Sequence, residues 1–287
     1  MSSQEGSPLR FGVIADVQYA DKETRGKRRY REALIRLEEA VAAFCADGDL
    51  DFVVQLGDLI DGRMLVAESR ADLRAVMDSF RPLDVPLHHV IGNHCLSVPR
   101  HELLAELRQQ SGRSSIVQAG VRIIIVDSME FSILGTEEGT EGRAAARAWL
   151  DANMGEDRPQ ATNWNGGLGA AQRAWLASEL LRAREADQLA LVFAHHPVSP
   201  QASRSHLLAW DHAEVRGVLQ QACVPIVWLA GHEHVGGYAL EGSVHHLTMQ
   251  GMLESPVADS SFAVFELQSR ELRVSGRGLV PDRSLIV

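Results

Sequence analysis

The sequence predicts an α/β fold, because short apolar runs alternate with segments of helical period. The runs are rich in Val, Ile and Leu, as in strands buried on both faces. They are RFGVIAD (10–16), DFVVQLGD (51–58), PLHHVIGNH (86–94), VRIIIVDS (121–128), QLALVFAHHP (188–197) and PIVWLAGH (225–232). Segments with helical period lie between them, at 27–44, 67–80, 100–112, 170–186 and 205–222. This alternation is typical of α/β proteins.

The chain changes character after residue 232, where the helical segments stop. The runs 244–250, 261–269 and 271–278 follow one another without helices and predict an antiparallel meander. No repeat or clear linker divides the sequence, so we expect one domain over 1–287, with residues 1–9 flexible. The segment 135–168 is rich in glycine at both ends. It is predicted to be an insertion near the functional site, with a short helix around 141–153.

Composition excludes several classes of protein. Hydrophobic residues make up 45% of the chain, enough for a sizeable core, and the net charge is −10. An acidic balance argues against nonspecific binding to nucleic acid or to an anionic membrane. No apolar run approaches the roughly 20 residues that span a bilayer. The three cysteines form no CxxC motif and fit a reducing compartment. We therefore expect a soluble, cytoplasmic protein that acts on a small molecule.

Polar side chains that bind metals follow almost every predicted strand. They are Asp16, Gln18, Asp58, Asn93, His94, His195, His196, His232 and His234. Taken singly, each is more often a turn former, a helix cap or a core histidine. The carboxyl ends of strands in an open α/β sheet share one edge, however, so the whole set is predicted to converge. Asp127 also ends a predicted strand, where it either joins this edge or caps a turn.

The chemistry of the set points to metal-assisted phosphoryl transfer. Carboxylate, amide and imidazole donors together suit Mn²⁺ and tolerate Fe²⁺ or Zn²⁺. The donors are too many for one ion that also holds substrate, and they fit two ions that share a carboxylate. Two ions about 3.5–4 Å apart hold a phosphoryl group and lower the pKa of water. The sequence therefore predicts a hydrolase with two divalent ions, Mn²⁺ favoured.

The order of these motifs resembles the calcineurin-like metallophosphoesterases. The pattern D-x-[HQ], GD, GNH, H-x-P and GHxH runs through residues 16–234. This resemblance implies a four-layer α/β/β/α sandwich with the site at strand ends along one edge. The stretches DVQYAD, KRRYREAL, WNGGLG, LAW and GRGLVPDR look like the manganese-dependent ADP-ribose/CDP-alcohol diphosphatases. That branch hydrolyses the phosphoanhydride bond of ADP-ribose, CDP-choline or CDP-glycerol to a nucleoside monophosphate and a phosphorylated product.

The resemblance also implies a role for each residue that matches a motif. One ion would be held by Asp16, Gln18, Asp58 and His234, and the other by Asp58, Asn93, His195 and His232. His94 would lie over the scissile phosphate as the catalytic side chain. His196 departs from the branch and is expected to be structural. Gln18 stands where the wider superfamily usually has a histidine, and it either binds the ion and favours Mn²⁺ or hydrogen-bonds a ligand carboxylate.

Contacts with the rest of the substrate are less determined by the sequence. The basic cluster 27–31 is either a solvated helix face or a phosphate contact made by Arg25, Arg28 or Arg29. The loop Asn165, Gly166 and Gly167 either connects to a helix or closes its bare backbone over the substrate. Tyr19 and Trp164 either pack beneath this loop, which we favour, or stack on a base.

Four other functions compete with the diphosphatase interpretation. A cyclic-nucleotide phosphodiesterase, or a phosphomonoesterase such as a protein phosphatase, would use a similar pair of ions. A nuclease is disfavoured because the chain is acidic and has no long basic stripe. A scaffold protein that has lost its site is disfavoured because the set of metal donors is complete.

Overall fold

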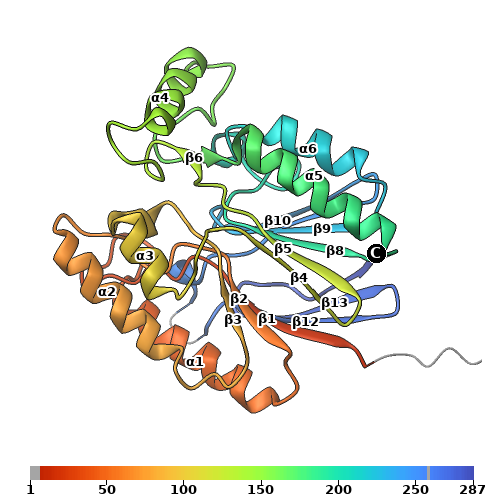
Figure 1. Cartoon of the computed structure of the whole chain (residues 1–287). Helices are drawn as coiled ribbons and strands as arrows, with labels where there is room; N and C mark the ends of the chain where they lie inside the picture. The colour runs from red at the N-terminus through yellow and green to blue at the C-terminus, as the bar shows by residue number, and fades with distance from the viewer. Residues whose placement is uncertain (1–6, 257–258) are drawn as a thin grey trace, which may run out of the picture.

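Two six-stranded sheets lie face to face, and helices cover the outer face of each (Figure 1). The computed structural model describes residues 7–256 and 259–287. This arrangement is the expected four-layer α/β/β/α sandwich, so the predicted fold class is confirmed. Within the described residues, no helix is both long and apolar enough to cross a membrane.

The first sheet combines strands from the two ends of the chain, in the order β14-β13-β12-β1-β2-β3. Its strands are β1 (Leu9–Ile14), β2 (Phe52–Gln55), β3 (Leu87–His89), β12 (Phe262–Gln268), β13 (Glu271–Arg277) and β14 (Arg283–Ile286). Its helices are α1 (Glu32–Asp47), α2 (Val66–Ser79) and α3 (Arg100–Glu106). The connections through helices make β1, β2 and β3 parallel, whereas β12 to β14 pair antiparallel.

The second sheet has the order β10-β11-β9-β8-β5-β4. Its strands are β4 (Ser114–Gln118), β5 (Val121–Ile125), β8 (Ala190–Ala194), β9 (Ile226–Ala230), β10 (Gly237–Glu241) and β11 (Val244–Thr248). Its helices are α5 (Gly169–Glu185) and α6 (His212–Gln221), which cover the outer face. The carboxyl ends of β8 and β9 therefore point to the same edge of the molecule as those of β1 and β2.

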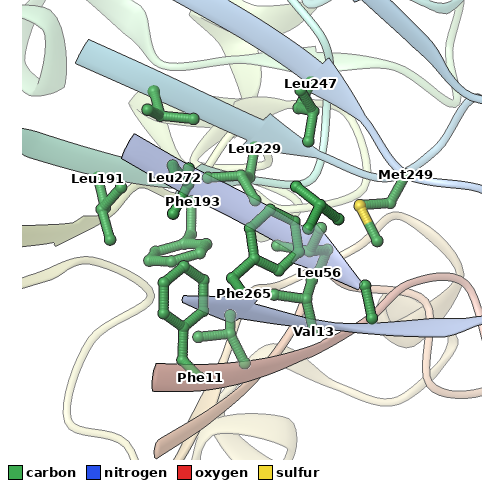
Figure 2. Packing of buried hydrophobic residues seen from close by; sticks show 14 of the residues in the cluster. Phe11, Val13, Leu56, Leu191, Phe193, Leu229, Leu247, Met249, Phe265 and Leu272 are labelled. Atoms are coloured by element: carbon green, nitrogen blue, oxygen red, sulfur yellow. The ribbon is translucent and has the colours of Figure 1, made fainter. Parts of the chain in front are cut away.

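The space between the sheets is filled by alternate residues of the strands. Figure 2 shows Phe11 and Phe265 of the first sheet meeting Phe193 of the second. The rings of Phe11 and Phe265 stack with centroids 5.1 Å apart, and Phe193 meets Phe11 edge-on at 5.8 Å. The intervening Gly12 faces α1, where an added Cβ would lie 2.8 Å from the ring of Phe44. The close approach of α1 to the sheet therefore requires glycine at position 12.

Several predicted boundaries differ from the structure. The predicted strand 86–94 is a strand only over Leu87–His89, because the chain then turns so that His94–Ser97 forms a 3-10 helix. The helix predicted over 27–44 begins at Glu32, since a backbone bridge between Arg25 and Arg28 holds the preceding segment in a turn. The helix predicted over 100–112 ends at Glu106, and that over 205–222 begins at His212. Leu9 already lies in β1, and residues 1–6 of the segment expected to be flexible lie outside the described residues.

The antiparallel meander predicted after residue 232 is wrong as a single unit. Strand β11 pairs parallel with β9 in the second sheet, whereas β12 pairs antiparallel with β1 in the first. Between them the chain crosses from one sheet to the other through a 3-10 turn, Met252–Glu254. Backbone hydrogen bonds from Met252 N to Ala15 O (2.9 Å) and from Leu253 N to Asp16 O (3.0 Å) fix this turn beside the end of β1. The crossover brings Glu254 to the functional edge.

The segment 135–168 contains helix α4 (Glu141–Asn153), at the position predicted for it, and strand β7 (Gly166–Gly167), which pairs with β6 (Phe131–Ser132). The Thr140 hydroxyl caps α4 by accepting from Arg143 N at 3.2 Å. Figure 1 shows α4 standing away from the sandwich. Its base is anchored by Trp149, which stacks on Trp210 with centroids 4.7 Å apart. The far end of the segment returns to the functional edge.

Candidate metal centre and cleft

The carboxyl ends of four parallel strands place the predicted metal donors together. Asp16 follows β1, Asp58 follows β2, His195 follows β8 and His232 follows β9. The loops are joined by backbone hydrogen bonds, including Gln18 N to Asp58 O at 2.8 Å. Asp16, Gln18, Asp58 and His232 all have positive φ, from 45° to 67°. Left-handed backbone is costly for such residues and collects at functional sites, where the surrounding structure imposes it.

His195 lies at the centre of one group of donor atoms. Its Nδ1–H donates to Leu56 O at 2.8 Å, so Nε2 carries the lone pair. Nε2 lies 3.1 Å from Asn93 Oδ1 and 3.3 Å from Asp58 Oδ2. It also lies 3.1 Å from His232 Nδ1. A backbone carbonyl that fixes the far nitrogen of a histidine is the usual arrangement around a metal ligand.

His232 is held in the complementary tautomer by Asn165. Its Nε2–H donates to Asn165 Oδ1 at 2.9 Å, which leaves the lone pair on Nδ1, facing His195 Nε2. When His195 carries a second proton, its Nε2–H can donate to His232 Nδ1, and when that proton leaves, both ring nitrogens offer lone pairs that a cation can bind. Asn165 is in turn fixed by its Nδ2, which donates to Gln160 O (3.0 Å) and His206 O (2.8 Å). The donor atoms present therefore fit a divalent cation at this position.

A second group of donors gathers around Asp16 and His234. His234 Nε2 lies 3.5 Å from Asp16 Oδ1, and its Nδ1 faces Glu254 Oε1 at 3.4 Å. Gln18 Nε2 donates to Asp58 Oδ2 at 3.1 Å, while its Oε1 is buried and has no hydrogen-bond partner among the described residues. A buried carbonyl oxygen without a donor is costly unless a cation binds it. Asp58 touches both groups of donors, as a bridging carboxylate would.

The buried carboxylates of the centre favour positive charge on the neighbouring histidines. Burial disfavours charged imidazole, yet the hydrogen bond and charge of Asp16 raise the pKa of His234 to about 10. Burial likewise opposes a charged His195, but Asp58 raises its pKa to about 9. Burial also favours a neutral Asp58, yet the charge and hydrogen bond of His195 lower its pKa. A metal ion and these protons compete for the same place, so binding of the ion displaces them.

His94 is held over the centre by its backbone and by Asp61. His94 N donates to Asp58 Oδ1 at 2.8 Å, and its Nδ1 donates to Asp61 O at 2.8 Å. The Asp61 carboxylate lies 3.5 Å from the same nitrogen and pairs on its other oxygen with Lys22. Burial lowers the pKa of His94, so the neutral ring carries Nδ1–H and leaves Nε2 free. The sequence analysis missed Asp61, although its position three residues after Asp58 in GDLID is a usable signal.

A cleft of about 970 Å³ opens beside the centre. The donors Gln18, Asn93, His232 and His234 line it, together with His94. Its other lining side chains include three cations and an apolar group. These are Lys22, Arg28 and Arg63, and Met64, Leu96, Leu134, Trp164 and Leu207. Cations next to a metal centre and apolar side chains beyond it suit a ligand with phosphate at one end and an apolar or aromatic group at the other.

Arg28 is the expected basic contact that lines this cleft. Its Nε lies 3.4 Å from Glu254 Oε1, so it is linked through Glu254 to His234. Arg25 and Arg29 do not line the cleft, and Arg29 instead pairs with Glu32 at 3.6 Å. Tyr19 packs against the core cluster that includes residues of α1 and does not line the cleft. The packing favoured for Trp164 is wrong, because its side chain is 44% exposed and lines the cleft.

The expectation that Asn165, Gly166 and Gly167 cover the substrate is wrong. All three residues are buried, and Asn165 is fully enclosed. The glycines are required for close packing, since a Cβ on Gly167 would lie 2.5 Å from Asp211 Oδ1. One on Gly166 would lie 2.5 Å from Ser128 O. The segment acts behind the site, where Asn165 orients His232.

Asp127 has a structural role, whereas His196 lies against the centre. Asp127 pairs with Arg100 and accepts from Met129 N at 3.0 Å, so it caps a turn. His196 is buried, with its Nδ1 2.8 Å from Ser128 Oγ and its ring 4.3 Å from that of His232. Its Nε2 is buried without a hydrogen-bond partner among the described residues, and a ring nitrogen of His196 lies in one group with ring nitrogens of His195 and His232, so the structural role expected for it stays a prediction.

Comparison with known proteins agrees with this geometry. Residues 9–236 match the family model for calcineurin-like phosphoesterases. A manganese-dependent ADP-ribose/CDP-alcohol diphosphatase of Arabidopsis thaliana is 32% identical and covers 96% of each chain. The Mus musculus protein of the same name is 30% identical over 95% of this chain and 92% of its own. The crystal structure of a dimetal phosphatase from Danio rerio superposes with a TM-score of 0.90 at 29% identity, covering 97% of this chain and 98% of that one.

The family match spans the motifs from β1 to the second histidine of GHEH, which are the residues that build the centre. The relatives extend the likeness to nearly the whole chain, including the insertion and the last strands. The chain therefore belongs to the calcineurin-like phosphoesterase family.

Proposed function

We propose that this chain is a metal-dependent hydrolase of the phosphoanhydride bond in ADP-ribose or CDP-alcohols, such as CDP-choline and CDP-glycerol. The products are a nucleoside monophosphate and a phosphorylated partner. The observation that carries the proposal is the convergence of imidazole, amide and carboxylate donors beside the cleft, where His195 Nε2 lies 3.1 Å from Asn93 Oδ1 and 3.3 Å from Asp58 Oδ2. Relatives with this named activity match over nearly their full length, which supports the substrate class.

The family pattern implies a division of the donors between two ions. Asp16, Gln18, Asp58 and His234 would hold one divalent ion, and Asp58, Asn93, His195 and His232 the other. When bound, two such ions neutralise phosphoryl oxygens and supply an activated water at neutral pH. Mn²⁺ is favoured, because an amide oxygen at Gln18 is a harder donor than the imidazole that would favour Zn²⁺ or Fe²⁺.

His94 is the catalytic side chain in this proposal. Because its Nδ1–H is bound by Asp61 O, a proton taken up by the ring resides on Nε2, in the cleft. From there Nε2 donates to a phosphoryl oxygen as its negative charge grows, or passes the proton to the departing phosphate. The Asp61 carboxylate at 3.5 Å stabilises the charged ring while it carries this proton.

The cations of the cleft distinguish a diphosphate from a simple ester. Lys22, Arg28 and Arg63 line the same cleft as His94, and a second phosphate bound beside the centre lies within their field. Each cation already has an acidic partner: Asp61, Glu254 and Glu68 respectively. These ion pairs hold the three charged groups in place before the substrate arrives, which lowers the entropy lost on binding.

The test is a substrate panel with Mn²⁺ in which the products are identified. We expect CDP-choline and ADP-ribose to give CMP and AMP, with phosphocholine and ribose 5-phosphate as the other products. Faster cleavage of a cyclic nucleotide or of a phosphopeptide would overturn the proposal in favour of the competing phosphoesterases. Absence of hydrolysis with any divalent ion would favour a scaffold. The cytoplasmic location is part of the proposal, and it is supported by the three free cysteines.

A further inference from the structure

Trp164 differs from the other tryptophans in its surroundings. Trp149 stacks on Trp210, Trp175 lies against the guanidinium of Arg113, and Trp228 is buried. Trp164 is 44% exposed, and among the described residues its ring stacks on no other aromatic ring. Exposed aromatic surface of this size next to a polar centre is typical of a ligand-binding surface.

The cleft contains an apolar wall, consisting of Met64, Leu134, Trp164 and Leu207. Met64, Leu134 and Trp164 are all exposed, although their side chains are large and hydrophobic. A phosphate-binding cleft gains nothing from such side chains unless the ligand has an apolar or aromatic part. The wall and the centre share one cavity of about 970 Å³, large enough for a whole nucleotide.

The position of the apolar wall relative to the centre is fixed by Asn165. Trp164 precedes Asn165 in the chain, and Asn165 Oδ1 accepts from His232 Nε2 at 2.9 Å. Asn165 Nδ2 donates to His206 O at 2.8 Å, and Leu207 follows His206. One buried side chain thus anchors Trp164 and Leu207 to the ring of a proposed metal ligand. The wall is held before ligand binds, at a short distance from where phosphate is proposed to bind.

The apolar wall lacks groups that read the edge of a base. The charged side chains around it are already paired: Glu68 with Arg63 at 3.1 Å, and Asp61 with Lys22. Ser97 also lines the cleft, but its hydroxyl oxygen is buried. The four side chains of the apolar wall therefore offer apolar contact and stacking, which every base accepts.

We propose that Trp164 is a specificity-determining residue that stacks on the nucleobase, so that the cleft requires a base without selecting which one. This inference rests on the proposed function and adds the residue and the mode of recognition. It accounts for one site that accepts both purine and pyrimidine conjugates. In contrast, a site that hydrogen-bonds one base edge rejects the others strongly.

The experiment compares ADP-, GDP-, UDP- and CDP-choline, which differ only in the base and share the alcohol of a proposed substrate, with P1,P2-dimethyl diphosphate, which has no base. In the unaltered protein we expect kcat/KM for the four conjugates to agree within about tenfold. Trp164→Ala should lower kcat/KM for all four by about tenfold to a hundredfold, chiefly through KM. For dimethyl diphosphate, Trp164→Ala should change kcat/KM by less than about threefold. Trp164→Phe should keep most of the activity toward the conjugates that Trp164→Ala loses.

Met154→Ala is the matched control, because Met154 is a 64% exposed apolar side chain of the same segment that does not line the cleft. It should behave as the unaltered protein. The stacking proposal is overturned if Trp164→Ala matches this control on the conjugates. A base preference above about a hundredfold would overturn the proposed lack of selectivity.

Binding without turnover separates this inference from the proposed function. AMP should quench tryptophan fluorescence in the unaltered protein and much less in Trp164→Phe, whereas ribose 5-phosphate should quench neither. If no conjugate is hydrolysed but AMP quenching depends on Trp164, the proposed function fails and the stacking site stands. If the conjugates are hydrolysed but AMP does not quench the fluorescence of Trp164, the stacking proposal is wrong while the proposed function stands.

Discussion

Asn165→Ala tests how the buried frame of the site controls metal binding. The change removes three hydrogen bonds, to His232 Nε2 at 2.9 Å, Gln160 O at 3.0 Å and His206 O at 2.8 Å. Loss of buried partners of this kind costs about 1–3 kcal/mol each where water does not replace them. We therefore expect unfolding free energy to fall by about 3 kcal/mol, with a melting temperature lower by ~6–12 °C. The free His232 ring should also weaken Mn²⁺ binding by about tenfold to a hundredfold.

The assay is a titration with Mn²⁺ in which free ion is counted by electron paramagnetic resonance, run beside thermal unfolding. Asn153→Ala is the matched control, since Asn153 Nδ2 donates to one carbonyl, Trp149 O at 2.7 Å, in the same segment but away from the centre. It should lose stability only slightly and bind Mn²⁺ as before. Unchanged Mn²⁺ affinity in a folded Asn165→Ala protein would refute the claim that Asn165 orients a metal ligand.

Three further changes test separate parts of the site and fold. His94→Ala should lower kcat by about 10²–10⁴ while Mn²⁺ content stays the same, and a near-normal kcat would remove His94 from the chemistry. Gln18→His should raise the affinity for Zn²⁺ relative to Mn²⁺, because an imidazole nitrogen replaces the buried amide oxygen Oε1. An unchanged ratio of the two affinities would mean that Gln18 does not contact the ion. Burial lowers the pKa of His89 to about 3 in the folded protein. Between pH 6.5 and 3 the unfolded chain therefore takes up a proton at His89 that the folded protein does not, and the free energy of unfolding falls as pH falls. In His89→Phe the slope of unfolding free energy against pH over this range should decrease by up to about 1.4 kcal/mol per pH unit, and equal slopes would contradict the assignment.

The α/β alternation and the convergence of the donors were predictable because both depend on local pattern. A strand that ends in Asp16 or His232 carries its side chain to the sheet edge whatever the rest of the chain does. The sheet order was harder to predict, since β11 and β12 are close in sequence and join different sheets. That crossover is set by packing between the sheets, which single-sequence patterns do not contain.

The supporting residues of the site show the same limit. Asp61 lies three residues after Asp58 and was within reach of sequence reasoning. Glu254 reaches His234 only through the crossover turn, so no spacing signals it. Asn165 sits in a glycine-rich segment that looks like a substrate loop, and only its burial shows that it faces the back of His232. Polar residues that act through another side chain depend on tertiary contacts more than the donors do.

The central claim is that one set of side chains holds two ions that share Asp58. Anomalous diffraction from crystals grown with Mn²⁺ tests it most directly, because each ion gives its own peak. We predict two peaks about 3.5–4 Å apart. One should lie among Asp16, Gln18 and His234, the other among Asn93, His195 and His232, with Asp58 touching both. A single peak, or two peaks that do not share Asp58, would contradict the account.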